Sequence, residues 1–213
     1  MGDVAMAVPV IRALTKQYPT CKITVLSKPF LRPIFDKMPQ VSFFDAQVNT
    51  KHKGIIGLYK LYHELKKEKI THIADFHNVL RSKIVRALFI LSGKPSASID
   101  KGRAEKKALT RTTNKVFRQL KTSHQRYADV LSKLGFSLDL TNTPLIKKKS
   151  LSEKVTLLTG LKEGYWIGIA PFAAFEGKVY PAHLMEEVIK KIASKGLKIV
   201  LFGGGKHEVK IWH

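Results

Sequence analysis

The sequence predicts an α/β protein of two domains, each a parallel sheet covered by helices on both faces. Three observations support this prediction. Runs rich in β-branched residues alternate with amphipathic helical stretches along most of the chain, which is typical of βαβ units. A stretch without periodicity, containing a proline and a lysine run, interrupts the alternation. A second alternation of strand and helix then begins, so we expect a linker between two domains.

Residues 1–140 contain the elements of the first domain. The chain opens on GDVAMAVPVIRAL, whose apolar residues recur at helical spacing. A Gly-Asp turn of this kind normally follows a β-strand, so we expect the first strand of this domain to be missing. The further elements are strands over 22–28, 41–47, 71–77 and 96–100, and helices over 30–37, 54–69, 79–93 and 124–135.

The segment 141–155 is predicted to be the interdomain linker, and 156–213 the start of the second domain. Strands are expected over 165–173 and 197–205, with a helix over 181–196 between them. Two strands are too few for a doubly wound sheet. We therefore expect this domain to be only partly present.

Composition limits the class of protein. The chain has 213 residues, of which 44% are apolar and 9% aromatic, enough for a folded core. Its single cysteine, Cys21, excludes an internal disulfide and fits a reducing compartment. The sequence shows neither a signal peptide nor an apolar run of the ~18 residues that a membrane span needs. We expect a soluble, cytoplasmic protein.

The chain is strongly basic, with 38 Lys and Arg against 16 Asp and Glu and a net charge of +22. This charge favours an anionic partner, such as nucleic acid, a phosphorylated glycolipid, a nucleotide or a membrane surface. Lysines also keep protein surfaces hydrated. A basic α/β protein that binds nucleic acid or another polyanion without catalysis is therefore the alternative to an enzyme. Such binding would weaken steeply with salt.

Several familiar site patterns are missing from the sequence. The histidines show no metal-ligand spacing, and a lone cysteine cannot build a zinc site. The stretch FGGGKHE has neither the spacing of a P-loop nor a Ser or Thr after its lysine. No RNA-recognition fingerprint or aromatic stacking platform is present. We expect no metal, no cofactor and no nucleic-acid partner.

Four stretches, in this order, carry a resemblance: MGDVAMAVPVIRAL, DFHNVLRS, APFAAFEGKVYP and IVLFGGGKHE. Together they resemble the heptosyltransferases of lipopolysaccharide biosynthesis, glycosyltransferase family 9. The resemblance implies the GT-B arrangement of two Rossmann-like domains, with the active site in the cleft between them. The N-terminal domain would be nearly complete and the C-terminal domain only partly present.

The resemblance also implies the reaction and its partners. A heptose would pass from ADP-heptose to the inner core of lipopolysaccharide, with inversion and without a metal. We expect a cytoplasmic monomer that makes peripheral contact with the inner face of the cytoplasmic membrane. Family members extend beyond the part matched here, so we expect these 213 residues alone to be inactive.

The resemblance assigns chemistry to Asp3 and Lys178. Asp3 matches the family's Gly-Asp turn, which implies the base that accepts the proton of an acceptor hydroxyl, with Gly2 allowing the sugars to approach the backbone. From the residues alone, Asp3 would more simply cap the following helix. Lys178 lies between a predicted strand and a predicted helix, where phosphates are readily bound. The matching lysine contacts the donor phosphates, although a solvated surface lysine is the alternative.

Two further stretches are assigned to the acceptor. His77, Asn78 and Arg81 follow a predicted strand in DFHNVLRS, a region that the family uses for the acceptor. Alternatively, Asn78 caps the next helix and Arg81 points to solvent. The stretch KGRAEKKALTR is strongly cationic, and a solvated flexible loop is the alternative to an anion site there. Its residues assigned to acceptor phosphates and carboxylates are Lys101, Arg103 and Arg111.

Overall fold

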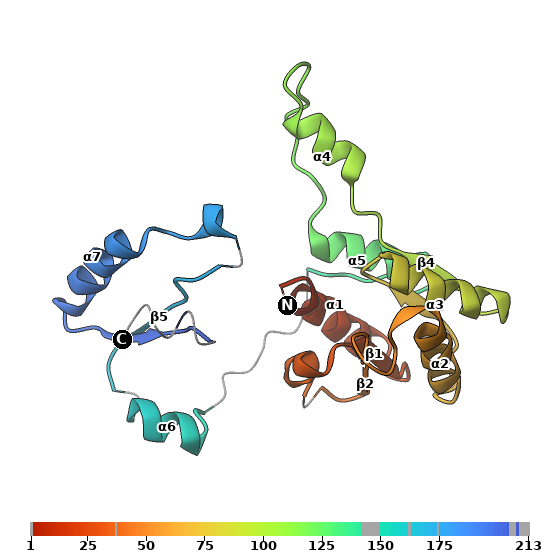
Figure 1. Ribbon diagram of the computed structural model, residues 1–213, viewed down its shortest axis with the longest axis horizontal. Coiled ribbons are helices and arrows are strands. Elements are labelled where there is room, and N and C mark those ends of the chain that lie inside the picture. Colours follow the sequence, from red (N-terminus) through yellow and green to blue (C-terminus); the bar gives the residue numbers. More distant parts are fainter. Residues whose placement is uncertain are drawn as a thin grey trace. The chain divides into compact units, whose positions relative to one another are not determined.

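The computed structural model describes residues 2–36, 38–141, 150–161, 163–173, 175–204 and 208. The chain divides into two compact units, Met1–Ile146 and Lys147–His213 (Figure 1). We call them unit 1 and unit 2 and describe each by itself. Most of the predicted linker, residues 142–149, lies outside the described residues.

Unit 1 alternates strands and helices as the sequence predicts. Its elements are α1 (Gly2–Gln17), β1 (Ile23–Ser27), η1 (Pro29–Ile34), β2 (Val41–Asp45), α2 (Gly54–Lys66), β3 (Ile73–Asp75), α3 (Leu80–Leu91), β4 (Ser96–Ser98), α4 (Arg103–Thr110) and α5 (Ser123–Ser132). Two expectations were wrong. The predicted helix over 30–37 is a 3₁₀ turn, in which Pro33 removes a backbone donor. The cationic stretch after residue 102, interpreted as a loop, with a solvated flexible loop as the alternative to an anion site, forms helix α4, which stands out from the body of the unit.

The strands of unit 1 form two parallel pairs. β1 pairs with β2 from Ile23 opposite Val41 to Ser27 opposite Asp45, and β3 pairs with β4 over three residues. Within the described residues no hydrogen-bonded ladder joins one pair to the other. Side chains provide the connection between the two pairs instead.

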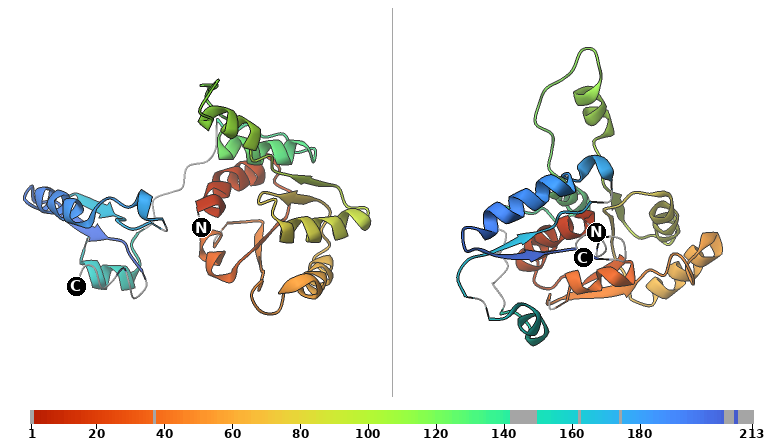
Figure 2. Two further views of the ribbon diagram at one scale, coloured as in Figure 1. Left: turned by 45° about the horizontal axis from the view of Figure 1, so that its top comes forward. Right: turned by 60° about the vertical axis from the view of Figure 1, so that its left-hand side comes forward.

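Two helix layers each span both strand pairs. On one face, α1 packs against α5 (Figure 2), and their buried side chains form one cluster with residues of β1, β2 and β4. Val10 of α1 and Val130 of α5 are at its centre. On the other face, α2 packs against α3, and their cluster takes in Phe44 of β2 and Ile73 of β3. Helices on both faces of a parallel sheet define the doubly wound α/β class.

A buried histidine fixes the N-terminal half of α2. The His52 side chain is 1% exposed. Its Nδ1 accepts the Gln47 N–H at 3.0 Å, and its Nε2 lies 3.3 Å from Glu64 Oε2. The backbone of this segment lies so close to α2 that a Cβ on Gly57 would be 2.4 Å from the His52 carbonyl carbon. Gly57 is therefore required by contact with a neighbouring backbone.

Unit 2 contains α6 (Glu153–Thr159), β5 (Trp166–Ile169), η2 (Glu176–Lys178), α7 (Ala182–Ala193) and β6 (Lys198–Leu201). β5 and β6 are parallel, with Trp166 opposite Lys198. The strand–helix–strand order over these elements is as predicted. Helix α6 was not predicted and begins inside the segment 141–155, where the Ser152 hydroxyl accepts the Val155 N–H at 3.4 Å. No helix in the described part of either unit is long and apolar enough to cross a membrane.

Replacing Gly57 by Ala is expected to destabilise unit 1 by about 1–3 kcal/mol, because the added methyl overlaps the His52 backbone. Urea unfolding followed by circular dichroism measures the difference. Gly2→Ala is the control, since a Cβ there has no atom within 4 Å. Equal stability of Gly57→Ala and Gly2→Ala would contradict the close approach.

Candidate functional site

The carboxyl end of β3 is built around Asp75, the last residue of that strand. The side chain is buried, and its Oδ1 accepts the N–H groups of His77 at 3.0 Å and Asn78 at 2.7 Å. Oδ2 lies 3.9 Å from Arg86 Nε and accepts no hydrogen bond among the described residues. Asp75 was not among the predicted site residues. An Asp that ends a strand and precedes a polar turn is the signal that indicates such an anchor.

Asn78 connects the β3 turn to the neighbouring strand. It has a positive φ of 46°, a conformation that Asn tolerates better than most residues. Its Nδ2 donates to the Ile99 carbonyl at 3.0 Å, just beyond β4. The alternative that Asn78 caps the next helix is wrong, because Val79 is the N-cap residue of α3. The His77 and Arg81 side chains are exposed, and neither is paired within the described part of the chain.

The first turn of α1 is connected to the same site through α5. The Tyr127 hydroxyl donates to the Asp3 carbonyl oxygen at 3.1 Å. The Tyr127 ring stacks on Phe76 of the β3 turn, with centroids 4.6 Å apart and planes 20° apart. Burial raises the pKa of Tyr127, and the Asp3 carboxylate raises it further. Tyr127 therefore stays a protonated donor at neutral pH and holds the Asp3 backbone beside the turn that carries His77.

The Asp3 carboxylate itself is exposed and accepts no hydrogen bond from any described residue. Asp3 lies inside the first turn of α1, which begins at Gly2. The geometry thus gives no support to the alternative that its side chain caps the helix. Gly2 is also exposed, with nothing within 4 Å of an added Cβ.

Arg126, next to Tyr127, fixes the base of the cationic segment. Its side chain is 8% exposed, and it donates to Glu105 Oε2 at 2.6 Å, the Asp100 carbonyl at 3.1 Å and the Lys121 carbonyl at 3.3 Å. Gly102 has a positive φ of 60°, and any Cβ there would overlap the Arg126 guanidinium. Neither Arg126 nor Tyr127 was predicted as a site residue. Most of their partners lie 20 or more positions away in the sequence, and no local sequence pattern indicates such contacts.

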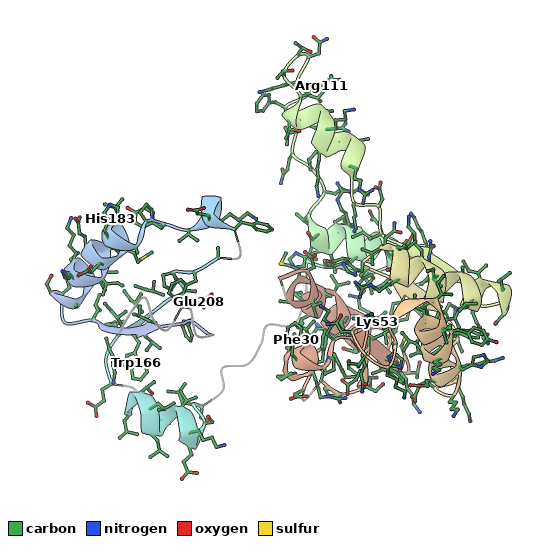
Figure 3. All side chains as sticks on the ribbon, in the orientation of Figure 1. Phe30, Lys53, Arg111, Trp166, His183 and Glu208 are labelled. Atoms are coloured by element: carbon green, nitrogen blue, oxygen red, sulfur yellow. The ribbon has the colours of Figure 1, made fainter. Side chains whose placement is uncertain are left out.

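The predicted basic residues 101–111 are only partly brought together. Lys101 and Arg103 lie at the start of α4, beside the Arg126 contacts. Arg111 lies at the other end of α4 (Figure 3), about 12 Å away at 1.5 Å per helical residue. Its Nε donates to the Asn114 carbonyl. Lys101 and Arg103 are thus close together at the base of the segment, and Arg111 lies apart from them at the far end of α4.

Lys178 lies in unit 2 on η2, between β5 and α7, as the sequence predicts. Its side chain is exposed, with Nζ 5.4 Å from the centroid of the Phe175 ring. The Lys178 N–H donates to the Phe175 carbonyl at 2.9 Å, which closes the turn. This position after a strand and before a helix is one where phosphate groups are readily bound.

Cavities and metal ligands add little to this site. In the described ranges, no three His, Cys, Asp or Glu side chains are grouped so that they could hold a metal ion. A cavity of about 360 Å³ lies beside Arg126 and Asp100. A larger one, of about 540 Å³, lies between the C-terminal ends of α2 and α3, lined by Lys66, Lys69 and Lys94 among others. It lies at the ends of β3 and β4 opposite to the candidate site.

Comparison with protein families identifies the chain. The model of glycosyltransferase family 9 (heptosyltransferase) matches residues 58–213. The chain therefore belongs to glycosyltransferase family 9. A comparison with curated protein sequences found no match.

Solved structures of this family have the same fold. A family 9 glycosyltransferase from Veillonella parvula matches with a TM-score of 0.73 at 21% identity, over 100% of this chain and 62% of its own. Escherichia coli ADP-heptose lipopolysaccharide heptosyltransferase II matches with a TM-score of 0.59 at 22% identity, over 95% of this chain and 61% of its own. Escherichia coli heptosyltransferase WaaC with ADP matches with a TM-score of 0.63 at 16% identity, over 99% of this chain and 67% of its own. The chain thus spans about three fifths of the length of the first two, and the predicted α/β fold of the GT-B glycosyltransferases is confirmed.

Replacing Arg126 by Ala is expected to cost about 1.5–3 kcal/mol, because it removes a buried guanidinium that donates to the Glu105 carboxylate and to two backbone carbonyls. Limited proteolysis is expected to cut residues 101–121 faster, since their anchoring contacts are lost. Arg118→Ala is the matched control: Arg118 lies 3.8 Å from the same carboxylate but is 65% exposed, so its loss should cost at most about 1 kcal/mol. Similar effects of both substitutions would show that Arg126 does not anchor the segment.

Proposed function

We propose that this protein is an inverting, metal-independent glycosyltransferase that transfers a heptose from ADP-heptose to the inner core of lipopolysaccharide. The observation that carries the proposal is the match to the family model over residues 58–213. Among the matched structures are heptosyltransferases solved with ADP and with ADP-2-deoxy-2-fluoro heptose. These ligands support a nucleotide-diphosphate donor for the present chain.

Unit 1 is proposed to bind the acceptor and to supply the base. The Asp3 carboxylate accepts the proton of the acceptor hydroxyl while the acceptor oxygen bonds to the anomeric carbon and the bond to ADP breaks. Its exposure and lack of hydrogen bonds among the described residues leave both carboxylate oxygens accessible. The contact from Tyr127 to the Asp3 carbonyl fixes the backbone without occupying the carboxylate.

The proposed acceptor contacts come from the β3 turn, the first turn of α1 and the segment that contains α4. His77, Asn78 and Arg81 extend from the turn that Asp75 organises, and Gly2 leaves open space beside Asp3. Lys101 and Arg103 would bind one acid group of the inner core, and Arg111 another. Guanidinium and ammonium groups bind phosphates and carboxylates through charge-assisted hydrogen bonds.

Unit 2 is proposed to bind the donor. Lys178 offsets the negative charge that develops on the departing diphosphate, a role that a preorganised cation performs without a metal. Its exposed position between β5 and α7 supports this role. We further propose that the protein acts as a monomer on the cytoplasmic face of the membrane that contains the acceptor.

In the full-length protein, Asp3→Asn is expected to lower heptosyl transfer by about 10²–10⁴-fold, because the amide cannot accept the proton. Donor binding should remain nearly unchanged. The measurement is ADP release with ADP-heptose and a lipopolysaccharide core acceptor. Asp36→Asn removes another exposed carboxylate of unit 1 and serves as the control. Normal turnover in Asp3→Asn would overturn the assignment of the base.

Lys178→Ala is expected to weaken donor binding and slow transfer by about 10–100-fold, the value of a hydrogen bond to a charged group. Titration calorimetry with ADP-heptose measures the binding. Lys195→Ala removes an exposed lysine that follows α7 and should leave both quantities unchanged. Absence of any transfer by the unsubstituted full-length protein would overturn the proposed function itself.

A further inference from the structure

The outer face of α2 exposes large apolar side chains. Ile55 and Ile56 are each 75% exposed and Tyr59 is 53% exposed. The opposite face of the same helix is buried through Leu58, Leu61 and Leu65. Single exposed apolar residues are common on protein surfaces, but three on adjacent positions of one helical turn make a patch. We call Lys53, Ile55, Ile56, Tyr59 and Lys60 the α2 patch.

Buried contacts of His52 and Gly57 fix the helical turn that carries the α2 patch. His52 precedes it and is buried between the Gln47 N–H and the Glu64 carboxylate. Gly57, on the buried face of the same helical turn, allows the chain at His52 to lie directly against the helix. The Tyr59 ring meets the His63 ring edge to face, with centroids 4.5 Å apart. The isoleucines therefore sit on a fixed turn.

The rim of the α2 patch is cationic. Lys53 and Lys60 are exposed and form no ion pair with any described residue. The nearby Glu64 is already engaged: Lys51 lies 2.7 Å from its Oε1, and this hydrogen bond is the largest cause of the lowered pKa of Glu64. No uncompensated carboxylate lies between Lys53 and Lys60 in the sequence. Anionic surfaces can thus approach without repulsion from the patch.

The α2 patch lies at the same end of unit 1 as the candidate site. The C-terminal ends of α2 and α3 line one cavity, and Tyr62 of α2 hydrogen-bonds Ser92 after α3. The two helices are therefore parallel, and their N-termini lie at the other end together. The N-terminus of α3 follows directly on the turn that carries His77 and Asn78.

We propose that the α2 patch binds the surface of an anionic lipid bilayer. Ile55 and Ile56 enter the boundary between headgroups and acyl chains, and Lys53 and Lys60 contact lipid phosphates. Apolar side chains beside lysines on one helix face are typical of helices that lie in a membrane interface. Lys53 and Lys60 are exposed and unpaired among the described residues, and this positive charge beside the isoleucines complements an anionic bilayer surface. Binding of the α2 patch to a bilayer does not depend on the proposed function. The proposed function enters only as the reason for such binding, because it places the acceptor in a membrane.

The test is vesicle flotation of the chain without donor or acceptor, so its outcome does not depend on transferase activity. Vesicles of phosphatidylcholine alone are compared with vesicles that also contain phosphatidylglycerol. Binding to the anionic vesicles is expected. The double substitution Ile55→Ser with Ile56→Ser should weaken it by about 100-fold, since each buried isoleucine contributes tenfold or more. Leu91→Ser at the other end of α3, where Leu91 is 84% exposed, is the matched control and should bind normally.

Charge is tested by Lys53→Gln with Lys60→Gln, which should weaken binding about tenfold or more. Lys66→Gln with Lys67→Gln removes two exposed lysines at the opposite end of α2 and is the control. Circular dichroism establishes that each variant is folded. Equal binding to neutral and anionic vesicles, unchanged binding of the isoleucine variant, or a dimer that this variant abolishes would each overturn the proposal. A folded chain that binds anionic vesicles but transfers no sugar would leave this inference standing and remove only the proposed function.

Discussion

Two successive residues of α5 hold the candidate site of unit 1 together. Tyr127 donates to the backbone of Asp3 and stacks on Phe76. Arg126 fixes the start of the cationic segment through Glu105 and Asp100. Consecutive helix residues point about 100° apart, so one turn of α5 reaches three segments that are distant in the sequence. Positioning of Asp3, the β3 turn and Lys101 thus depends on how firmly α5 packs against α1.

The candidate site contains two kinds of residue: buried side chains that form hydrogen bonds, and exposed side chains that are accessible to a ligand. Asp75, Arg126 and Tyr127 are buried, and each forms hydrogen bonds with backbone groups. Arg126 also donates to the Glu105 carboxylate. Asp3, His77 and Arg103 are exposed. A catalytic or binding group works best when its own backbone is rigid and its side chain is uncommitted. Unit 1 has this arrangement around Asp3.

Much of the fold follows from local patterns in the sequence, while the contacts at the site do not. Strand and helix positions were predictable because burial on two faces imposes clear periodicities, as in Ile23–Ser27 and Gly54–Lys66. Helix α4 was missed because it is short and rich in charged residues and buries none of its residues, so no apolar face marks it as a packed helix. Helix α1, which carries Asp3 in its first turn, was predictable from its apolar spacing. The roles of Asp75 and Tyr127 were not, since they depend on tertiary neighbours rather than on their own sequence surroundings.

The sheet of unit 1 is divided between β1 and β3, and this has a consequence for cooperativity. No backbone ladder couples the two strand pairs among the described residues. The coupling is carried by side chains of both helix layers, such as Val10 and Val130 in one and Leu61 and Phe89 in the other. Apolar packing weakens on cooling, whereas backbone hydrogen bonds depend less on the hydrophobic effect. Low temperature would therefore loosen the join between the two halves of unit 1 before it disturbs either strand pair.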